Sequence, residues 1–394
     1  RPKRIVLTSD AVKYFEEVMQ LLQSLLRPRF LPMVAPPKPW KPDGTGGGFL
    51  EIGQPLVKRE DELVVGAALD RSDLRLPCEA VNALQATPFR LNRRIYELFQ
   101  QVWERREPKE LLPLLVPPPM PPYIPKPKDK DRKQAKLHVK RKRERNHVRG
   151  LIKAAINNRI RMAERLAVCE DLAQFEQFWF PPQLDWRGRE YPVPQGVQPQ
   201  GDDLQKALLE FAVAKALGER GAEWLAIELA SLYGHGMDKA PFRDRIEWVR
   251  ARREAIIACV ERPFDGPRLW LEAEEKWRFQ ACADDWAKFA LYGPETPSRF
   301  PLAVDGTCNV LQHCAALGRD AEGALWTNVL PGPQREPRCA GAPGIVESML
   351  KARKTKRARE WLQEGILSRS LVKRATMTTP YGITMWGVRA QLRS

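Results

Sequence analysis

Apolar residues recur at helical spacing along several stretches of the chain, with charged and polar residues between them. This spacing predicts helices over residues 11–27, 79–106, 151–180, 203–217 and 221–233. A shorter apolar run at 301–304 has the length of a strand and ends in a carboxylate. Mostly helical periodicity with short extended runs predicts an α+β chain that is predominantly helical.

Proline and glycine interrupt this pattern in two places. Residues 31–50 read LPMVAPPKPWKPDGTGGGFL and predict a loop or extended chain. Between Pro108 and Pro127 there are nine prolines in 20 residues, so this segment is expected to be irregular or polyproline-like. Regular order is expected to resume only after Gly150.

The segment from Lys126 to Arg149 is strongly basic. It holds 12 Lys and Arg residues and three acids, a net charge of +9. Two interpretations remain open: a flexible, solvated face, or a segment that follows the phosphates of a nucleic acid.

Composition narrows the class of protein. The 394 residues allow two or three domains, and no apolar stretch approaches the roughly 18 residues of a membrane span. The formal net charge of +16 favours a polyanionic partner. Nucleic acid is the leading interpretation, although ribosome-like or anionic-lipid partners would produce the same charge. The seven cysteines form no CxxC pair, which is typical of reduced thiols in a cytosol-like compartment.

One candidate for chemistry is the pair Asp305–Gly306 at the end of the 301–304 run. A carboxylate followed by a residue without a Cβ suits a metal site, because a ligand can approach the backbone carbonyl. Taken alone, an Asp-Gly pair after a strand is more typical of a turn.

A second candidate lies in residues 368–384, SRSLVKRATMTTPYGIT. Arg369, Lys373 and Tyr381 recur at multiples of four residues, which places them along one face of a helix. Pro380 is expected to end that helix near Thr379. Two cations and a phenol on one face could hold a triphosphate, but an ordinary solvated basic helix has the same pattern.

Four sequence blocks occur in a characteristic order. They are LDWRGREYPVP (184–194), YGHGMDKAPFRDRIEWV (233–249), LAVDGTCNVLQHCAALGRD (302–320) and RSLVKRATMTTPYGIT (369–384). Together they resemble the single-subunit DNA-dependent RNA polymerases of bacteriophages, mitochondria and chloroplasts. Residues 31–40 and 81–95 are also similar to this family, so the resemblance covers nearly the whole chain.

The resemblance implies a fold and an activity. The family has the cupped-hand arrangement of thumb, palm and fingers. Residues 1–105 would then be a partial N-terminal domain, 106–176 a thumb-like region with the Pro-rich and basic linker, 177–330 the palm with a helical insertion, and 331–394 the start of the fingers. The implied reaction is templated addition of ribonucleoside triphosphates to an RNA 3′ end by two-metal phosphoryl transfer.

The resemblance also implies roles for residues at the nucleotide. Asp305 falls on the family's first metal-binding aspartate, with the carbonyl of Gly306 beside it, and the implied cofactor is magnesium. Lys373 matches the lysine that contacts the incoming triphosphate. Arg369 matches a second phosphate contact, and Lys239 matches a further lysine that lines the nucleotide site.

The remaining matched positions concern the sugar and the nucleic acid. Tyr381 matches the tyrosine that helps to select ribose over deoxyribose. Arg187 and Arg189 match arginines that hold the template–product duplex. The implied partners are a DNA template and promoter, the RNA product and ribonucleoside triphosphates, with no membrane and a monomeric chain.

The sequence departs from the family in three places. Val310 stands where the family usually has Gly, and residues 331–349 match the family poorly. The family's second metal aspartate belongs to a His-Asp-Ser motif, and no His-Asp pair occurs here. We therefore expect a fragment that lacks the C-terminal part of the palm and is inactive alone.

Two other functions remain open from the sequence. One is a family A DNA polymerase, which shares the palm and a helix with Lys and Tyr; the DWRGR block and Gly306 favour the RNA enzyme. The other is a decayed, non-catalytic nucleic-acid-binding remnant, which Val310 and the missing carboxylate support. The expected compartment is the cytoplasm of a bacterium or phage-infected host, and the alternative is a mitochondrion or plastid.

Overall fold

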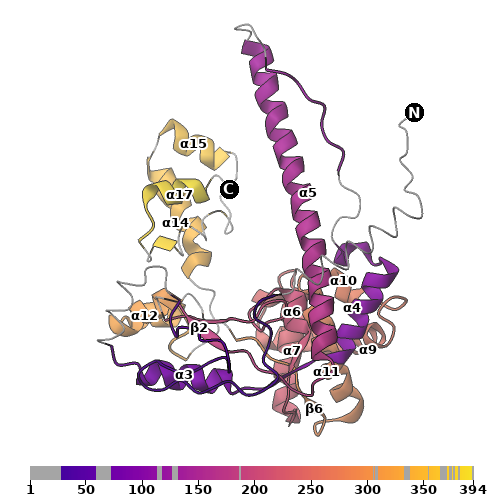
Figure 1. Ribbon diagram of the computed structural model, residues 1–394. Helices are drawn as coiled ribbons and strands as arrows, with labels where there is room; N and C mark the ends of the chain where they lie inside the picture. Colours follow the sequence, from indigo (N-terminus) through magenta and orange to yellow (C-terminus); the bar gives the residue numbers. More distant parts are fainter. Residues whose placement is uncertain are drawn as a thin grey trace, which may run out of the picture. The chain divides into compact units, whose positions relative to one another are not determined.

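The computed structural model describes residues 28–58, 72–112, 118–126, 132–185, 188–304, 306, 309–331, 338–353, 355–363, 371, 375, 378–379 and 382–392. Helices predominate among them, and the strands form three two-stranded antiparallel sheets, β1–β4, β2–β3 and β5–β6 (Figure 1). The prediction of a predominantly helical α+β chain is confirmed.

The chain divides into two compact units. The first comprises residues 1–238 and 242–302, and the second comprises 239–241 and 303–394. These units are coarser than the four segments expected from the sequence, so the boundaries of those segments stay a prediction.

The first unit contains most of the regular structure. Its elements are α3 (Arg75–Gln85), β1 (Phe89–Leu91), α4 (Arg93–Arg105), η1 (Lys109–Leu111), α5 (Arg132–Leu172), β2 (Pro182–Leu184), β3 (Glu190–Pro192), α6 (Asp203–Ala207), β4 (Leu209–Phe211), β5 (Lys215–Ala216), α7 (Gly218–Tyr233), α8 (Phe242–Ala251), α9 (Arg253–Glu261), α10 (Leu269–Glu272), α11 (Lys276–Tyr292) and β6 (Pro297–Ser298).

The second unit consists of helices, so far as the structure describes it. They are α12 (Asn309–Leu317), α13 (Ala321–Trp326), α14 (Arg338–Arg353), α15 (Lys356–Gln363) and α17 (Met385–Gln391). The short 3₁₀ helix η2 (Met237–Lys239) precedes α8.

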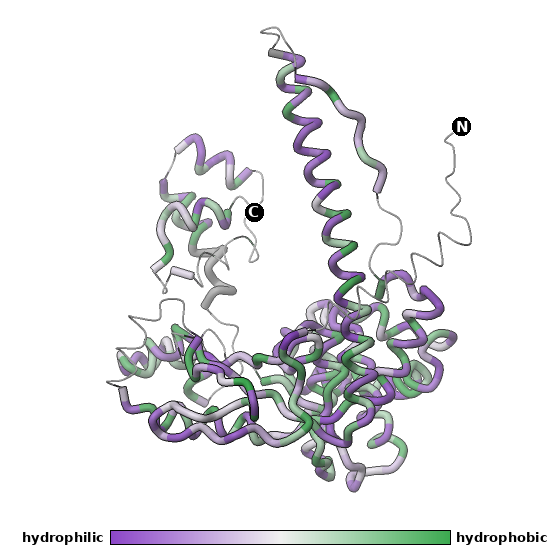
Figure 2. Tube along the Cα trace, viewed as in Figure 1, coloured by the Kyte–Doolittle hydropathy of each residue, from purple (hydrophilic) through white to green (hydrophobic). Residues whose placement is uncertain are grey.

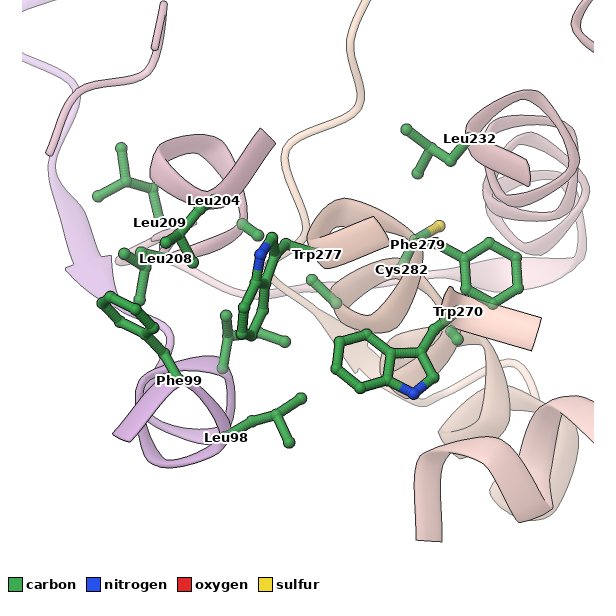
Figure 3. Close-up of a cluster of buried hydrophobic side chains, with 14 of the residues drawn as sticks. Leu98, Phe99, Leu204, Leu208, Leu209, Leu232, Trp270, Trp277, Phe279 and Cys282 are labelled. Atoms are coloured by element: carbon green, nitrogen blue, oxygen red, sulfur yellow. The ribbon is translucent and has the colours of Figure 1, made fainter. Parts of the chain in front are cut away.

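Helix α11 lies at the centre of the first unit. Its side chains are buried almost without interruption from Trp277 to Ala287, and it contacts α4, α6, α7, α9 and α10. A helix that is buried on every side needs small residues where neighbours approach, and Ala281, Cys282 and Ala283 supply them. Around it, Phe99 meets Trp277 edge to face at 5.8 Å between ring centroids (Figure 3).

The helix predicted over 79–106 is wrong in its middle. The chain forms α3, then β1, then α4. Pro88 has no N–H to continue a helix and disfavours helical backbone at Thr87, which explains the break. The side chain of Asn92 then caps the next helix by accepting a hydrogen bond from the backbone N–H of Ile95 at 3.1 Å.

The helix predicted over 151–180 begins much earlier and ends sooner. Helix α5 runs through the basic segment and through Gly150, and it ends at Leu172. Only its C-terminal part joins the core, through Met162, Val168, Cys169 and Leu172. No described side chain from Lys133 to Arg161 is buried, and this projecting part is mostly hydrophilic (Figure 2).

The other predictions of local structure have mixed outcomes. The helix over 221–233 is confirmed as α7, whereas 203–217 forms the short α6 followed by β4 and β5. The irregular conformation expected for 31–50 is confirmed, with isolated bridges such as that between Lys38 and Gly48. The helix predicted over 11–27 lies outside the described residues. In the part of the chain that the structure describes, no helix is both long and apolar enough to span a bilayer.

Candidate functional site

The described residues of the DWRGR block, 185, 188 and 189, lie between β2 and β3. The backbone N–H of Asp185 donates to the carbonyl of Arg189 at 2.8 Å, and its side chain accepts from the N–H of Arg189 at 3.0 Å. Gly188 has φ of +82°, a conformation that side chains rarely adopt. The aspartate and the glycine of the block therefore build the turn, and Arg189 lies exposed at its end. Arg187 lies outside the described residues.

The segment that leads to Asp305 is anchored from α11. The carboxylate of Asp285 accepts hydrogen bonds from Oγ of Ser298 at 2.6 Å and from the backbone N–H of Arg299 at 3.2 Å. Strand β6 also pairs with β5, so that Ser298 lies opposite Lys215. The sequence alone did not single out Asp285; a pair of acids in the otherwise apolar run of residues 281–287 was the available signal.

The strand predicted at 301–304 is wrong. These residues form neither helix nor strand, and Val304 is 94% exposed. A strand needs a neighbour to complete its hydrogen bonds, and none of the described residues pairs with 301–304.

Asp305 itself lies outside the described residues, but Gly306 is described. A Cβ at Gly306 would lie 1.9 Å from Oδ1 of Asn309, so any side chain here would require the Asn309 side chain to move. The close atom belongs to the first residue of α12, and Val310 follows it, half-buried, in the same helix. Among the described residues, no group of three His, Cys, Asp or Glu side chains is gathered closely enough to hold a metal.

The block 369–384 is described only in part. Arg369, Lys373 and Tyr381 lie outside the described residues. Leu371, Ala375 and Thr378 are helical, and Thr379 lies in a tighter turn, where its hydroxyl donates to the carbonyl of Ala375 at 2.8 Å. At these positions the expected end of the helix near Thr379 is confirmed.

Lys239 is exposed and lies in the loop between α7 and α8. The loop begins with three residues in the left-handed region, Gly234, His235 and Gly236, with φ of +76°, +52° and +88°. Its backbone is held by Glu274, which accepts from the N–H of His235 at 3.0 Å. Lys239 and Gly306 belong to the same compact unit.

A dense basic surface lies on the projecting part of α5. Lys136, Lys140 and Arg143 are exposed and are spaced so that they share one face of the helix. This spacing is visible in the sequence, but the prediction for the segment rested on its charge alone. A helix of 41 residues is roughly 60 Å long, which is enough to follow a duplex over many phosphates.

Part of the Pro-rich segment packs along the same helix (Figure 1). The carbonyl of Ile124 accepts from Nδ1 of His138 at 2.7 Å, and the carbonyl of Pro121 accepts from the guanidinium of Arg145. Arg145 also lies 5.7 Å from the centroid of the Tyr123 ring. Residues 118–126 have no regular secondary structure, as predicted, but they are held against α5.

A cavity of about 870 Å³ beside α11 is a weaker candidate for a ligand site. Three of its four cations are in ion pairs: Arg90 with Glu210 at 2.9 Å, and both Arg94 and Lys288 with Asp284 at 3.1 and 2.6 Å. Because five acids line the cavity beside these four cations, it is not suited to an anion.

The comparisons with known proteins agree with the arrangement of these blocks. Residues 215–394 match the family model described as DNA-dependent RNA polymerase. The mitochondrial DNA-directed RNA polymerase of Schizosaccharomyces pombe is 32% identical over 376 residues, which are 93% of this chain and 32% of that protein. The DNA-directed RNA polymerase of Enterobacteria phage T3 is 31% identical over 399 residues, covering 93% of this chain and 44% of that protein. The human mitochondrial enzyme is 30% identical and covers 95% of this chain and 31% of that protein.

Over more than nine tenths of its length the chain is similar to single-subunit DNA-directed RNA polymerases of phages and mitochondria. It spans about a third of the length of these mitochondrial relatives and less than half of the phage relative.

Proposed function

We propose that this chain serves templated RNA synthesis, the addition of ribonucleoside triphosphates to an RNA 3′ end. The observation that carries the proposal is the similarity over more than nine tenths of the chain to proteins named DNA-directed RNA polymerase. The thumb, palm and fingers of a cupped hand are proposed on the same ground.

The proposed metal site centres on Asp305. Its carboxylate and the carbonyl of Gly306 are oxygen donors, which magnesium prefers. Bound magnesium would stabilise the negative charge that develops on the attacking and leaving oxygens. The chain's own contribution is to orient these donors. Asp285 holds Ser298 and Arg299 near the end of the first unit.

The proposed nucleotide contacts are cationic. Lys373 and Arg369 would bind the triphosphate from one helix face, and Lys239 would reach it from the loop before α8. Tyr381 would discriminate ribose from deoxyribose, because selecting for a hydroxyl requires a group that senses it.

The proposed nucleic-acid contacts are Arg187, Arg189 at the turn between β2 and β3, and the exposed cations of α5. They would hold a DNA template and the RNA product by neutralising phosphates, and promoter recognition would add sequence specificity. We propose that the chain acts as a monomer. Its relatives are named as mitochondrial, chloroplastic or phage enzymes, which supports an organelle or a phage-infected cytoplasm as the site of action.

The test is Asp305→Asn in a polymerase that carries this chain. The substitution keeps the size of the side chain but removes its charge, so nucleotide addition is expected to fall by at least about a hundredfold while template binding stays nearly unchanged. Glu322→Gln, an exposed acid on α13, is the control. Elongation by Asp305→Asn at a tenth of the wild-type rate would contradict the assignment.

The same assay separates the other candidate functions. Preferential use of deoxyribonucleotides would favour a DNA polymerase. Tight binding without any templated addition, even when the missing motif is supplied in the same polypeptide, would favour a non-catalytic remnant. Val310, half-buried in α12 where the family usually has Gly, is the observation that supports the remnant.

A further inference from the structure

The loop that carries Lys239 is held at both ends. At its start, the N–H of His235 donates to Oε1 of Glu274 at 3.0 Å, and the His235 ring contacts the carbonyl of Glu272 at 2.9 Å. The N–H of Met237 then donates to the carbonyl of Gly234 at 2.9 Å. These contacts attach the first half of the loop to the junction between α10 and α11.

At the other end the loop is held by a buried arginine. Arg245 of α8 is only 6% exposed. One of its terminal nitrogens donates to the carbonyl of Asp238 at 2.9 Å, and the other donates to Oγ of Ser231 at 2.9 Å. Its guanidinium also lies 5.2 Å from the centroid of the Phe242 ring.

The carbonyl of Asp238 belongs to the peptide bond that leads into Lys239. Fixing that carbonyl therefore fixes the peptide plane from which the Lys239 side chain begins. The two terminal nitrogens of the guanidinium bind this carbonyl and Ser231 at the same time. A lysine has a single nitrogen at its end, so it is a poor replacement. The hydroxyl of Ser231 is itself oriented, because it donates to the carbonyl of Ile227 at 2.6 Å.

Burial of a guanidinium is unfavourable unless its donors are satisfied. Burial lowers the pKa of Arg245, and the nearby acids Asp238 and Glu228 oppose this change. An apolar side chain would fill the same space without this penalty. The presence of an arginine here therefore indicates that the position of the loop, and not packing alone, depends on it.

We propose that Arg245 is a positioning residue for Lys239. It holds the end of η2 so that the ammonium group of Lys239 is presented at one place to the phosphates of a ribonucleoside triphosphate. The inference rests on the proposed function, in which Lys239 contacts the triphosphate, and it adds a residue that never touches the nucleotide.

The probe is an acyl-phosphate derivative of ATP, used with magnesium and the whole chain. The acyl group leaves the terminal phosphate and forms an amide with a lysine amine beside it, and peptide mass spectrometry locates the modified lysine. Wild-type chain is expected to be labelled at Lys239. In Arg245→Met the labelling rate at Lys239 should fall about tenfold, because the hydrogen bond that holds the preceding carbonyl is removed.

Arg243→Gln is the matched control. Arg243 lies on the same helix and is exposed, and its partner is Glu247 at 2.8 Å, so its loss should leave the labelling of Lys239 unchanged. Hydrogen exchange supplies a second measurement. The amides of residues 235–239 should exchange faster in Arg245→Met than in Arg243→Gln, while those of α11 should not change. If Arg245→Met does not fold, Arg245→Lys takes its place, and the expected decrease in the labelling rate at Lys239 is then smaller.

The outcomes are distinguishable. Absence of labelling at Lys239 in the wild-type chain would overturn the proposed triphosphate contact itself. Equal labelling of wild-type chain and the Arg245 variants would overturn only the positioning role of Arg245. A loss of labelling that also occurs in Arg243→Gln would mean that α8 as a whole, and not Arg245, sets the loop.

Discussion

The carboxylate of Asp203 lies against the first turn of α11. It accepts hydrogen bonds from the backbone N–H groups of Trp277 at 2.8 Å and Arg278 at 2.9 Å, in a helix whose own N-cap residue supplies none. Burial nevertheless raises the pKa of Asp203 to about 6. The folded chain then binds more protons than the unfolded chain between about pH 4 and pH 6, so the contribution of this carboxyl to stability falls as the pH rises through that window.

The loss of stability with rising pH gives a prediction at the scale of one residue. The free energy of unfolding of wild-type chain minus that of Asp203→Asn should decrease by about 1 kcal/mol per pH unit between pH 4 and 6, and should level off above it. Denaturant unfolding at a series of pH values measures both proteins. A difference that stays constant across the window, or increases, would contradict the raised pKa.

Gly234 gives a second prediction at this scale. A Cβ there would lie 2.3 Å from the carboxyl carbon of Glu274, and φ is +76°. Gly293 also has positive φ, +87°, but a Cβ there would meet open space. Gly293→Ala should therefore lose roughly 1–3 kcal/mol from backbone strain alone, and Gly234→Ala at least about 1 kcal/mol more because Glu274 must move. Equal losses in chemical denaturation would show that Glu274 is not fixed.

At the scale of elements, α5 is the feature with the clearest consequence. Lys136, Lys140 and Arg143 lie on one face of its projecting part. Replacing all three with Gln keeps helix propensity nearly unchanged but removes three cations. The slope of log affinity for duplex against log salt should become shallower by roughly 0.9 for each phosphate that is no longer neutralised.

The control for α5 is a triple variant of cations on the compact part of the first unit. Arg243, Arg262 and Arg268 are exposed there, and their replacement with Gln changes the net charge equally. This variant should change the wild-type slope by less than the roughly 0.9 that corresponds to one phosphate. If both triple variants weaken binding alike, the charge acts through the whole surface and α5 has no special part in binding.

At the scale of the whole chain, residues 1–394 alone should bind a template–RNA hybrid but not extend it. Binding is expected from the charge of +16, and it should weaken steeply with added salt. Extension is expected to fail because these residues include no His-Asp pair to supply the second metal-binding carboxylate. The measurement is primer extension with magnesium and four ribonucleotides beside a salt titration. Templated extension, or affinity independent of salt, would each contradict this prediction.

The spacing of apolar residues predicted a helix correctly where the tertiary structure buries the face that the spacing defines. Leu225, Leu229 and Leu232 are spaced for one buried face, and α7 forms where they predict it. The helix over 79–106 failed because apolar spacing continues across Pro88, where the backbone cannot follow it. The basic segment before Gly150 was not predicted as helix because it lacks apolar periodicity, yet its Lys, Arg and Gln residues are good helix formers.

The sequence by itself determined the similarity to DNA-directed RNA polymerases and the predominantly helical class, and it supplied the positions that we propose for chemistry, because these depend on residue identity and order along the chain. Only the tertiary structure decided which side chains hold those positions. Asp285 anchors the segment before Asp305, Asp203 caps α11, and Arg245 holds the carbonyl before Lys239. Each of these contacts joins residues from different elements or loops. A hydrogen bond forms only when donor and acceptor lie within a few tenths of an ångström of the preferred distance, and the spacing of residues along the chain does not specify that distance.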